Sequence, residues 1–194
     1  MVVVGGATMD LTSSPEPGRP LLRHTSNPGV VTQRPGGVGR NIAEAIARVA
    51  GSGDEPPLLV SAVGADLPGD ALIADCKNAG VDTRGVRRDD SRRTAVYAAM
   101  LEEEGELLSA VADMEVMDSL SADDFSGFAP QIDAAPLVVA DANLSPEVRP
   151  SPDCIPGERD AVRDAVREGC SRVNALNILR ALTGQTIGRP RLSF

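Results

Sequence analysis

The residues best suited to chemistry are a carboxylate near the start of the chain and an amide that follows two glycines. Asp10 comes shortly after an apolar segment, and Asn41 follows Gly36 and Gly37 where a helical pattern begins. A carboxylate accepts hydrogen bonds from paired hydroxyls, and an asparagine amide both donates and accepts them. Glycines let the backbone approach a ligand, and a helix N-terminus directs N–H groups toward its oxygens. These residue types indicate a site for a ligand with several hydroxyls.

Each of these residues also has a purely structural interpretation. Gly36 and Gly37, taken alone, are more typical of a turn before a helix than of a ligand loop. Asp10 would also suit a solvated turn, and Asn41 would also suit a helix cap. Only further motifs along the chain favour the binding interpretation.

Other reactive side chains do not form a recognisable site. His24 is the single histidine, and a lone histidine supports neither a catalytic triad nor a metal site. The acidic run 102–104 is typical of a solvated hairpin turn, because metal-binding carboxylates converge from a rigid frame. Cys76, Cys154 and Cys170 lack the close pairs of a zinc site or a disulfide framework. We therefore predict no metal ligand in this chain.

Alternating strands and helices must position the candidate residues. Continuous apolar runs predict buried strands over 2–4, 58–63 and 137–140, and helical spacing predicts helices over 42–50 and 71–79. This alternation is typical of a parallel α/β sheet, whose ligands bind beyond the carboxyl ends of the strands. We therefore expect Asp10 to be held rigidly at the end of the first buried strand.

A small β lid is predicted beside this sheet. The segments 94–101 and 106–111 flank the acidic turn and predict a hairpin. Segment 10–35 is rich in Pro, Ser, Thr and Gly, and we predict a loop there with a short edge strand over 30–33. A short helix is predicted over 121–128, with Ser121 as its N-cap.

Composition and charge limit the classes of partner that this chain could bind. The chain of 194 residues carries a formal net charge of −9, whereas nucleic acids and anionic membranes attract clustered Lys and Arg. No run of residues reaches the roughly 20 apolar positions of a membrane span. We therefore expect no nucleic-acid or membrane partner and a cytoplasmic location.

Five ordered motifs resemble the PfkB (ribokinase-like) carbohydrate kinase family. They occupy residues 5–10, 35–44, 63–70, 80–83 and 93–95. Segments 36–44 and 110–114 are most similar to the pseudouridine kinase branch. The resemblance covers 1–148, which we take as the substrate-binding part of a kinase domain, including the lid.

The resemblance implies a ribokinase-like α/β fold, a parallel sheet with flanking helices and a small β lid, incomplete at its C-terminal side. It implies ATP-dependent phosphoryl transfer to a sugar or nucleoside hydroxyl, with Mg²⁺ bound to ATP and pseudouridine as a candidate substrate. It places the sugar site at Asp10, Gly36, Gly37 and Asn41, with Thr94 and Asp113 as contacts from the lid and its base. It also implies two kinds of partner, a second copy bound through the lid and a fused glycosidase domain.

The family's catalytic Gly-Ala-Gly-Asp type of motif does not occur in the sequence. We therefore assign no catalytic residue, place the ATP site outside this chain, and expect the chain alone to be inactive. Residues 149–194 are predicted to be a divergent linker and tail with helices over 158–168 and 171–182.

Two other functional classes stay open. One is a non-catalytic sugar-binding or interaction module derived from the kinase fold. The other, a nicotinamide-dependent oxidoreductase, ranks last, because no G-x-G-x-x-G follows a strand.

Overall fold

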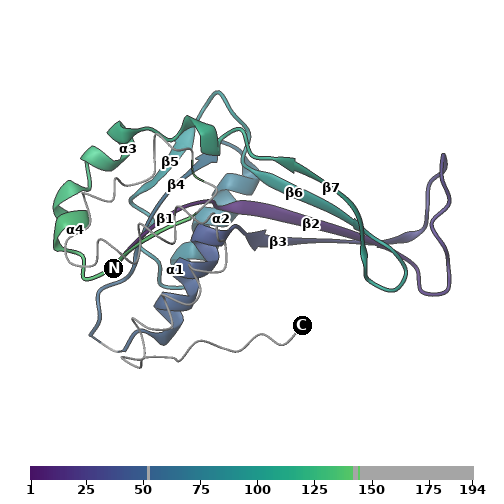
Figure 1. Cartoon of the computed structure of the whole chain (residues 1–194), viewed down its shortest axis with the longest axis horizontal. Helices are drawn as coiled ribbons and strands as arrows, with labels where there is room; N and C mark the ends of the chain where they lie inside the picture. Colours follow the sequence, from purple (N-terminus) through teal and green to yellow (C-terminus); the bar gives the residue numbers. More distant parts are fainter. Residues whose placement is uncertain (52, 142–143, 145–194) are drawn as a thin grey trace, which may run out of the picture.

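A parallel sheet and a second, projecting sheet make up the described part of the protein (Figure 1). The computed structural model describes residues 1–51, 53–141 and 144. The parallel sheet has the strand order β5-β4-β1-β8, with β5 at Val86–Asp89, β4 at Leu58–Gly64, β1 at Val2–Val4 and β8 at Val138–Ala140. The second sheet has the order β3-β2-β6-β7, with β3 at Gly29–Gly36, β2 at Thr8–Pro15, β6 at Val96–Leu101 and β7 at Leu107–Asp113.

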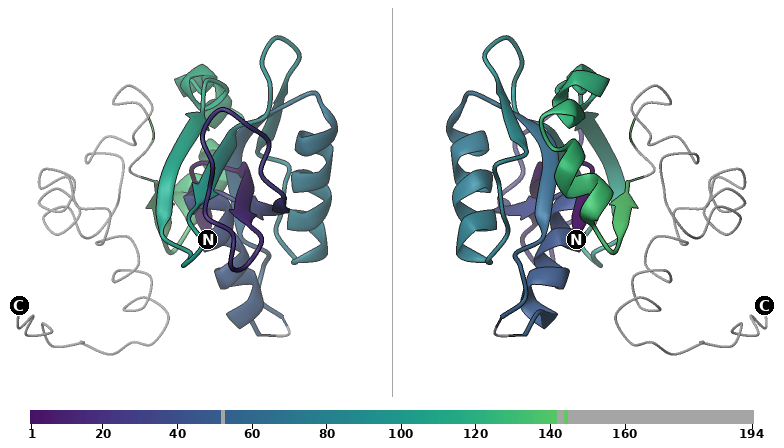
Figure 2. Two further views of the ribbon diagram at one scale, coloured as in Figure 1. Left: turned by 90° about the vertical axis from the view of Figure 1, so that its right-hand side faces the viewer. Right: turned by 90° about the vertical axis from the view of Figure 1, so that its left-hand side faces the viewer.

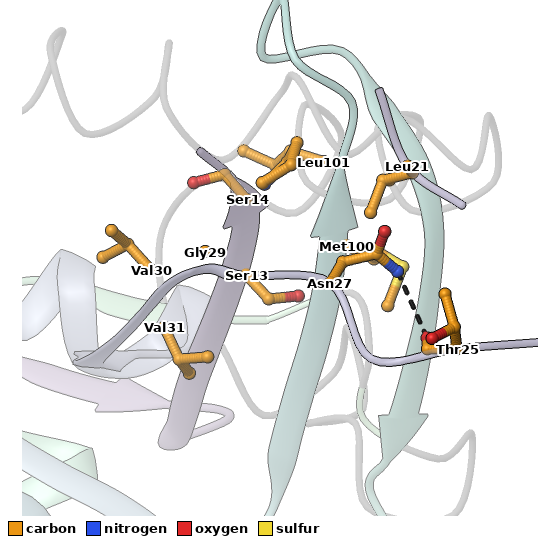
Figure 3. A pocket seen from close by; sticks show the side chains of 11 residues that line it. Ser13, Ser14, Leu21, Thr25, Asn27, Gly29, Val30, Val31, Met100 and Leu101 are labelled. Carbon is orange, nitrogen blue, oxygen red and sulfur yellow. Dashed lines mark hydrogen bonds between the residues drawn. The ribbon is translucent and has the colours of Figure 1, made fainter. Parts of the chain in front are cut away.

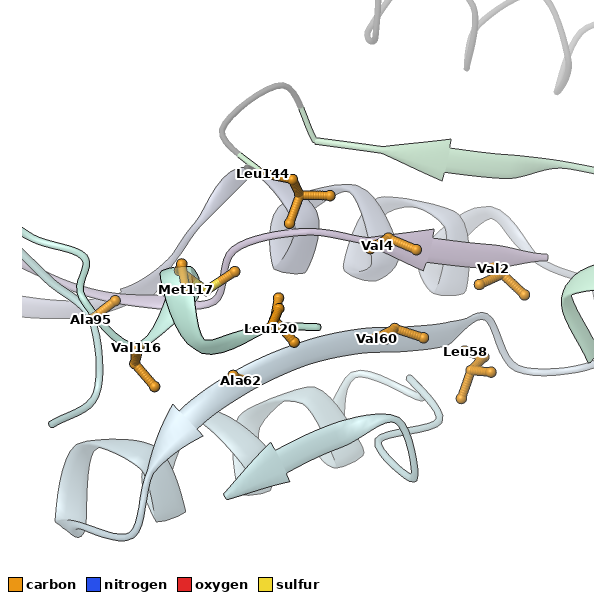
Figure 4. Packing of buried hydrophobic residues seen from close by; sticks show 10 residues of the cluster. All are labelled: Val2, Val4, Leu58, Val60, Ala62, Ala95, Val116, Met117, Leu120 and Leu144. Carbon is orange, nitrogen blue, oxygen red and sulfur yellow. The ribbon is translucent and has the colours of Figure 1, made fainter. Parts of the chain in front are cut away.

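Helices cover both faces of the parallel sheet. On one face lie α1 at Val38–Val49 and α2 at Leu67–Asn78, and on the other lie the 3-10 helix η1 at Met117–Ser119, α3 at Ala122–Ser126 and α4 at Ala129–Ala134. Figure 1 shows the strands between these two layers. The surroundings of β1 explain why its sequence is continuously apolar. Val3 packs under α1, whereas Val2 and Val4 pack against the η1 side (Figure 4), so a strand buried on both faces needs no polar alternation.

The sequence predictions for this sheet are confirmed in outline. The strands predicted over 2–4, 58–63 and 137–140 correspond to β1, β4 and β8, and α1 begins four residues before the predicted helix. The capped helix at Ser121 is present as α3, where the Asp124 carboxylate accepts a hydrogen bond from the Ser121 N–H at 2.8 Å. The strand β5 and the helix α4 had not been predicted. β5 escaped notice because its sequence, Val-Arg-Arg-Asp, is mostly charged.

The start of α2 was predicted wrongly. We expected a helix over 71–79, but α2 begins at Leu67. Asp66 caps it by accepting a hydrogen bond from the Gly69 N–H at 2.9 Å, and Pro68 lies in its first turn. Both are ordinary signals of a helix start, so the sequence contained the correct boundary.

The projecting sheet is larger than the predicted hairpin lid. The hairpin is present as β6 and β7, and the edge strand predicted over 30–33 is present within β3. Half of the predicted loop 10–35 is strand, however, because β2 and β3 pair over eight residues. Most residues of β3 are exposed, so this strand lacks the apolar alternation that would have marked its full length. The loop between β2 and β3 lies at the far end of this lid from the parallel sheet (Figures 1 and 2). There the Gly18 N–H donates to Glu103 of the β6–β7 turn at 2.7 Å.

No helix in the described part of the chain is long and apolar enough to cross a membrane. The tail predicted over 149–194, including its two helices, lies outside the described residues.

Candidate functional site

Asp10 lies at the base of the lid, on strand β2. This corrects the expectation that it ends a buried strand. The Thr8 hydroxyl, two residues earlier on the same face, donates to Asp10 Oδ1 at 2.7 Å. Gly36 lies under the carboxylate, and a Cβ atom built there would come within 2.1 Å of Asp10 Oδ2. Thr8 was not among the predicted site residues, because no strand was predicted over 8–15. Only within a strand does the spacing of Thr8 and Asp10 place both side chains on one face.

Gly37 turns the chain from the lid into α1. Its φ of 97° lies in the left-handed region, which favours glycine. A Cβ atom here would lie 2.4 Å from the carbonyl oxygen of Gly6. The same carbonyl accepts a hydrogen bond from the Arg40 N–H at 3.0 Å. The structure therefore brings Asp10, Gly36 and Gly37 together where β1 leads into β2 and α1 begins.

Asp141, which follows β8, brings a third segment to the turn between β1 and β2. The Gly6 N–H donates to Asp141 Oδ2 at 3.2 Å, and Asp141 is only 2% exposed. A Cβ atom at Gly5 would lie 2.4 Å from the Asp141 Cβ. Asp141 thus fixes the Gly5–Gly6 turn from the neighbouring strand. The sequence did not indicate this role of Asp141, because its partner is 135 residues away along the chain.

Asn41 lies on the first turn of α1 and is exposed. Its Oδ1 accepts a hydrogen bond from Arg40 Nη1 at 2.9 Å. Arg40 is buried and forms ion pairs with Glu44, at 2.6 Å, and with Asp75 of α2. The structure therefore shows Arg40 paired with acidic neighbours. Asn41 is joined to this network through its oxygen.

Thr94 is buried and connects three elements. Its hydroxyl donates to Asp66 Oδ1 at 2.5 Å and accepts from the Gly64 N–H at 2.9 Å. Its own N–H donates to Asp66 Oδ2 at 2.9 Å. Burial would raise the pKa of the Asp66 carboxyl, but the hydrogen bonds from Thr94 and Gly69 outweigh this effect and lower the pKa below its usual value. The contact predicted between Thr94 and a sugar stays a prediction, and its hydroxyl is already engaged.

Asp113, at the end of β7, is not brought together with Asp10. It pairs with Val96, which in turn pairs with Met9, so these three residues share the face of the lid opposite to Asp10. The Asp113 carboxylate accepts a hydrogen bond from Arg93 at 2.9 Å. Asp113 therefore anchors the lid hairpin to the segment before it.

The order of these segments matches a known family model. The model of the pfkB family carbohydrate kinases matches residues 1–151, which include all the segments that surround Asp10. The chain belongs to the PfkB family. The resemblance noted from the five motifs is thereby confirmed.

The chain is also similar in sequence or structure to individual members of the PfkB family. The pseudouridine kinase of Escherichia coli is 32% identical over 147 residues, which cover 76% of this chain and 45% of that protein. The structure of a carbohydrate kinase from Agrobacterium tumefaciens matches with a TM-score of 0.64 and 30% identity, over 74% of this chain and 45% of the other. The ribokinase of Arabidopsis thaliana, solved with ribose and ATP, matches with a TM-score of 0.55 and 25% identity, over 72% of this chain and 44% of the other.

These matches confirm the ribokinase-like α/β fold. The chain spans less than half the length of the curated relative and of both structures.

A hollow of about 250 Å³ lies at the other end of this PfkB lid. Ser13, Met100 and Leu101 line it from the strands, and Leu21, Thr25 and Asn27 line it from the β2–β3 loop (Figure 3). It begins three residues beyond Asp10 along β2, or about 10 Å at the usual rise per residue. We therefore do not count it as part of the Asp10 site.

The described residues contain no group of three or more His, Cys, Asp or Glu side chains that could hold a metal ion. None of them is assigned to the Mg²⁺ or the ATP that the PfkB family implies.

Proposed function

We propose that this chain provides the substrate site of an ATP-dependent kinase that phosphorylates a hydroxyl of a sugar or a nucleoside. The observation that carries the proposal is the Asp10 carboxylate, oriented by Thr8 and placed over Gly36 beside the start of α1. A carboxylate in this position accepts hydrogen bonds from two neighbouring hydroxyls, and Gly36 leaves the space that a side chain would fill. Gly37 and Asn41 complete the proposed site at the same turn.

Pseudouridine is the substrate that we favour. The relative at 32% identity is named a pseudouridine kinase, and its match covers 76% of this chain. Pseudouridine combines ribose hydroxyls, for which Asp10 is suited, with a planar base.

The lid has a defined task in this proposal. Its four strands project from the turn that holds Asp10, so a movement of the lid about this turn would cover a sugar bound there. Exclusion of water favours transfer of the phosphoryl group to the sugar over hydrolysis of ATP. Asp66 and Thr94 would keep the base of the lid in place during this movement.

A second candidate function is binding without phosphoryl transfer. It is favoured by the Asp10 site itself, because Asp10 and Gly36 would bind hydroxyls whether or not a phosphoryl group is transferred. In this alternative the Asp10 site binds a sugar or nucleoside, and ATP and Mg²⁺ have no part. The division into a kinase part at 1–148 and a tail at 149–194 belongs to both candidates, as does a cytoplasmic location.

The partner that we propose is a second copy of the chain, bound through the lid. Val31, Met100 and Val111 lie on the lid face opposite to Asp10, and they are 71%, 44% and 70% exposed. An apolar face of a sheet that is not covered is typical of an association surface. A fused glycosidase domain stays a prediction from the family resemblance.

The decisive experiment measures binding of pseudouridine and ribose to the 194-residue chain by titration calorimetry, with Asp10→Asn as the test variant. We expect Asp10→Asn to weaken binding of both ligands about 10- to 100-fold, because hydrogen bonds to a charged group contribute about 1.5–3 kcal/mol. Asp133→Asn, in the exposed part of α4, is the matched control and should bind like the wild type. Failure of the wild type to bind either ligand would refute the proposal.

Addition of ATP and Mg²⁺ separates the two candidates. Conversion of bound pseudouridine to a phosphorylated product, detected by mass spectrometry, would establish the kinase. Binding that depends on Asp10 without any product would establish the binding module.

A further inference from the structure

Tyr97 of β6 lies directly beside Asp10 in the lid. The parallel register of β2 and β6 pairs these two residues. Directly paired residues on neighbouring strands project from the same face, and their strands lie about 4.8 Å apart. The core confirms this assignment, because Met9 and Val96, which alternate with Asp10 and Tyr97, pack with residues of α2 on the other face. Asp10 and Tyr97 therefore share the face that is turned away from α2.

Tyr97 is an unusual residue in this chain. The sequence has one tyrosine, three phenylalanines and no tryptophan. Phe125 and Phe128 pack against the core, so the described lid has a single aromatic side chain, next to the proposed sugar-binding carboxylate. Tyr97 is only partly buried, and none of the hydrogen bonds between described residues involves its hydroxyl. Neither the core nor a polar contact accounts for a ring at this position.

The neighbours of Tyr97 leave room beside the ring. On the outer side it pairs with Ala112 of β7, whose side chain ends at Cβ. On the other side of Asp10, the paired residue is Arg34 of β3, which is exposed. Arg34 carries a charge that favours water, whereas the Tyr97 ring offers an apolar face. A planar, uncharged group attached to a sugar on Asp10 therefore fits on the Tyr97 side.

We propose that Tyr97 is a specificity residue that stacks on the base of a nucleoside whose ribose hydroxyls bind to Asp10. This inference rests on the proposed function, because it presupposes a sugar at Asp10. Stacking of a base on an aromatic side chain contributes about 1–3 kcal/mol. A free sugar has no planar face to stack, so Tyr97 would favour a nucleoside over ribose at the same site.

The test compares Tyr97→Leu and Tyr97→Phe in the 194-residue chain, by titration calorimetry with pseudouridine and with ribose. Tyr97→Leu keeps an apolar side chain but removes the ring, so we expect pseudouridine binding to weaken about tenfold, equivalent to about 1.4 kcal/mol. Ribose binding should stay unchanged. Tyr97→Phe keeps the ring and should bind both ligands like the wild type.

An independent readout uses the emission of the wild-type protein. Because the chain has no tryptophan and Tyr97 is its single tyrosine, tyrosine emission reports on this position alone. We expect saturating pseudouridine to quench this emission beyond its effect on free N-acetyltyrosinamide, and ribose to leave it nearly unchanged.

The outcomes separate the inference from the proposed function. If the wild type binds both ligands and Tyr97→Leu weakens neither, or both equally, stacking is overturned while the sugar site stands. If Tyr97→Phe loses as much pseudouridine affinity as Tyr97→Leu, the hydroxyl rather than the ring is responsible, and stacking is again overturned. If the wild type binds neither ligand, the proposed function fails and the inference fails with it.

Discussion

Gly36 shows how a single missing side chain shapes the proposed site. Its position under Asp10 leaves no room for a methyl group, because a Cβ atom would lie 2.1 Å from Asp10 Oδ2 and 2.4 Å from its Cγ. Real Cβ atoms do not come so close, so the Asp10 side chain would have to move. The effect should fall on the ligand site more than on the fold, because the obstructing group is the end of a side chain.

We predict that Gly36→Ala weakens binding of ribose and pseudouridine at least tenfold, since the displaced Asp10 carboxylate no longer meets both hydroxyls. Titration calorimetry measures the loss, and thermal unfolding followed by circular dichroism checks the fold. Gly127→Ala is the matched control, because a Cβ atom there has no neighbour within 4 Å and its φ of −65° suits alanine. Ligand binding by Gly36→Ala at wild-type strength would show that Asp10 does not need its present position.

At the scale of elements, Asp66 joins the end of β4, the start of α2 and the segment that enters β6. It caps α2 through the Gly69 N–H and binds Thr94 through two hydrogen bonds. Its pKa is lowered in the folded protein, because these hydrogen bonds outweigh the effect of burial. A carboxyl with a lower pKa in the folded state stabilises the fold above its unfolded pKa of about 3.9. This contribution is lost as the pH falls through the folded pKa.

We predict that Asp66→Asn lowers the free energy of unfolding by about 1–2 kcal/mol at pH 7, because the amide cannot accept all three hydrogen bonds and removes the negative charge at the start of α2. The difference from the wild type should shrink below about pH 4, where protonation removes the same charge from Asp66. Urea unfolding at pH 7, 4 and 3 measures both effects.

The control for this prediction is Asp70→Asn in the same helix. Asp70 is half exposed and pairs with the equally accessible Arg88 at 2.6 Å, and exposed ion pairs contribute about 0–1 kcal/mol. It should change stability less than Asp66→Asn does. A stability difference between Asp66→Asn and the wild type that stays constant from pH 7 to pH 3 would contradict the role given to the Asp66 charge.

At the scale of the whole molecule, the two sheets differ in how they are covered. The parallel sheet has a layer of helices on each face (Figure 1), whereas the lid exposes valine, methionine and leucine side chains to solvent. Its outer strands, β3 and β7, are also edges of the sheet. Uncovered faces and free edges favour association with another copy.

We predict that the chain self-associates through the lid and that the double variant Val31→Lys, Val111→Lys shifts it toward monomer. The two charges would lie on the apolar face opposite to Asp10 and would lose hydration in an interface. Sedimentation velocity over a range of concentrations measures the change. Thr32→Lys, on the same strand but on the Asp10 face, is the control. Equal association of the double variant and the wild type would show that this face is not the contact.

The sequence alone determined the family and the parallel sheet, and it indicated the glycines of the proposed site. Continuous apolar runs and the motif around Gly36, Gly37 and Asn41 are local signals. Each lies within one short segment, so it can be recognised without knowing which other segments it contacts in the fold. The capped helix at Ser121 was predicted for the same reason. The error at the start of α2 came from overlooking Asp66 and Pro68, which are signals of the same local kind.

Only the tertiary structure decided which side chains meet at the site. The strand pairing placed Tyr97 beside Asp10, moved Asp113 to the opposite face and brought Asp141 to Gly6 across 135 residues of sequence. The lid strand β2, and the part of β3 outside the predicted edge strand 30–33, escaped prediction for a related reason. A partly buried strand such as β2, or an exposed one such as β3, is specified by hydrogen bonds to its neighbours rather than by an apolar pattern of its own. Such pairing is a property of the folded chain.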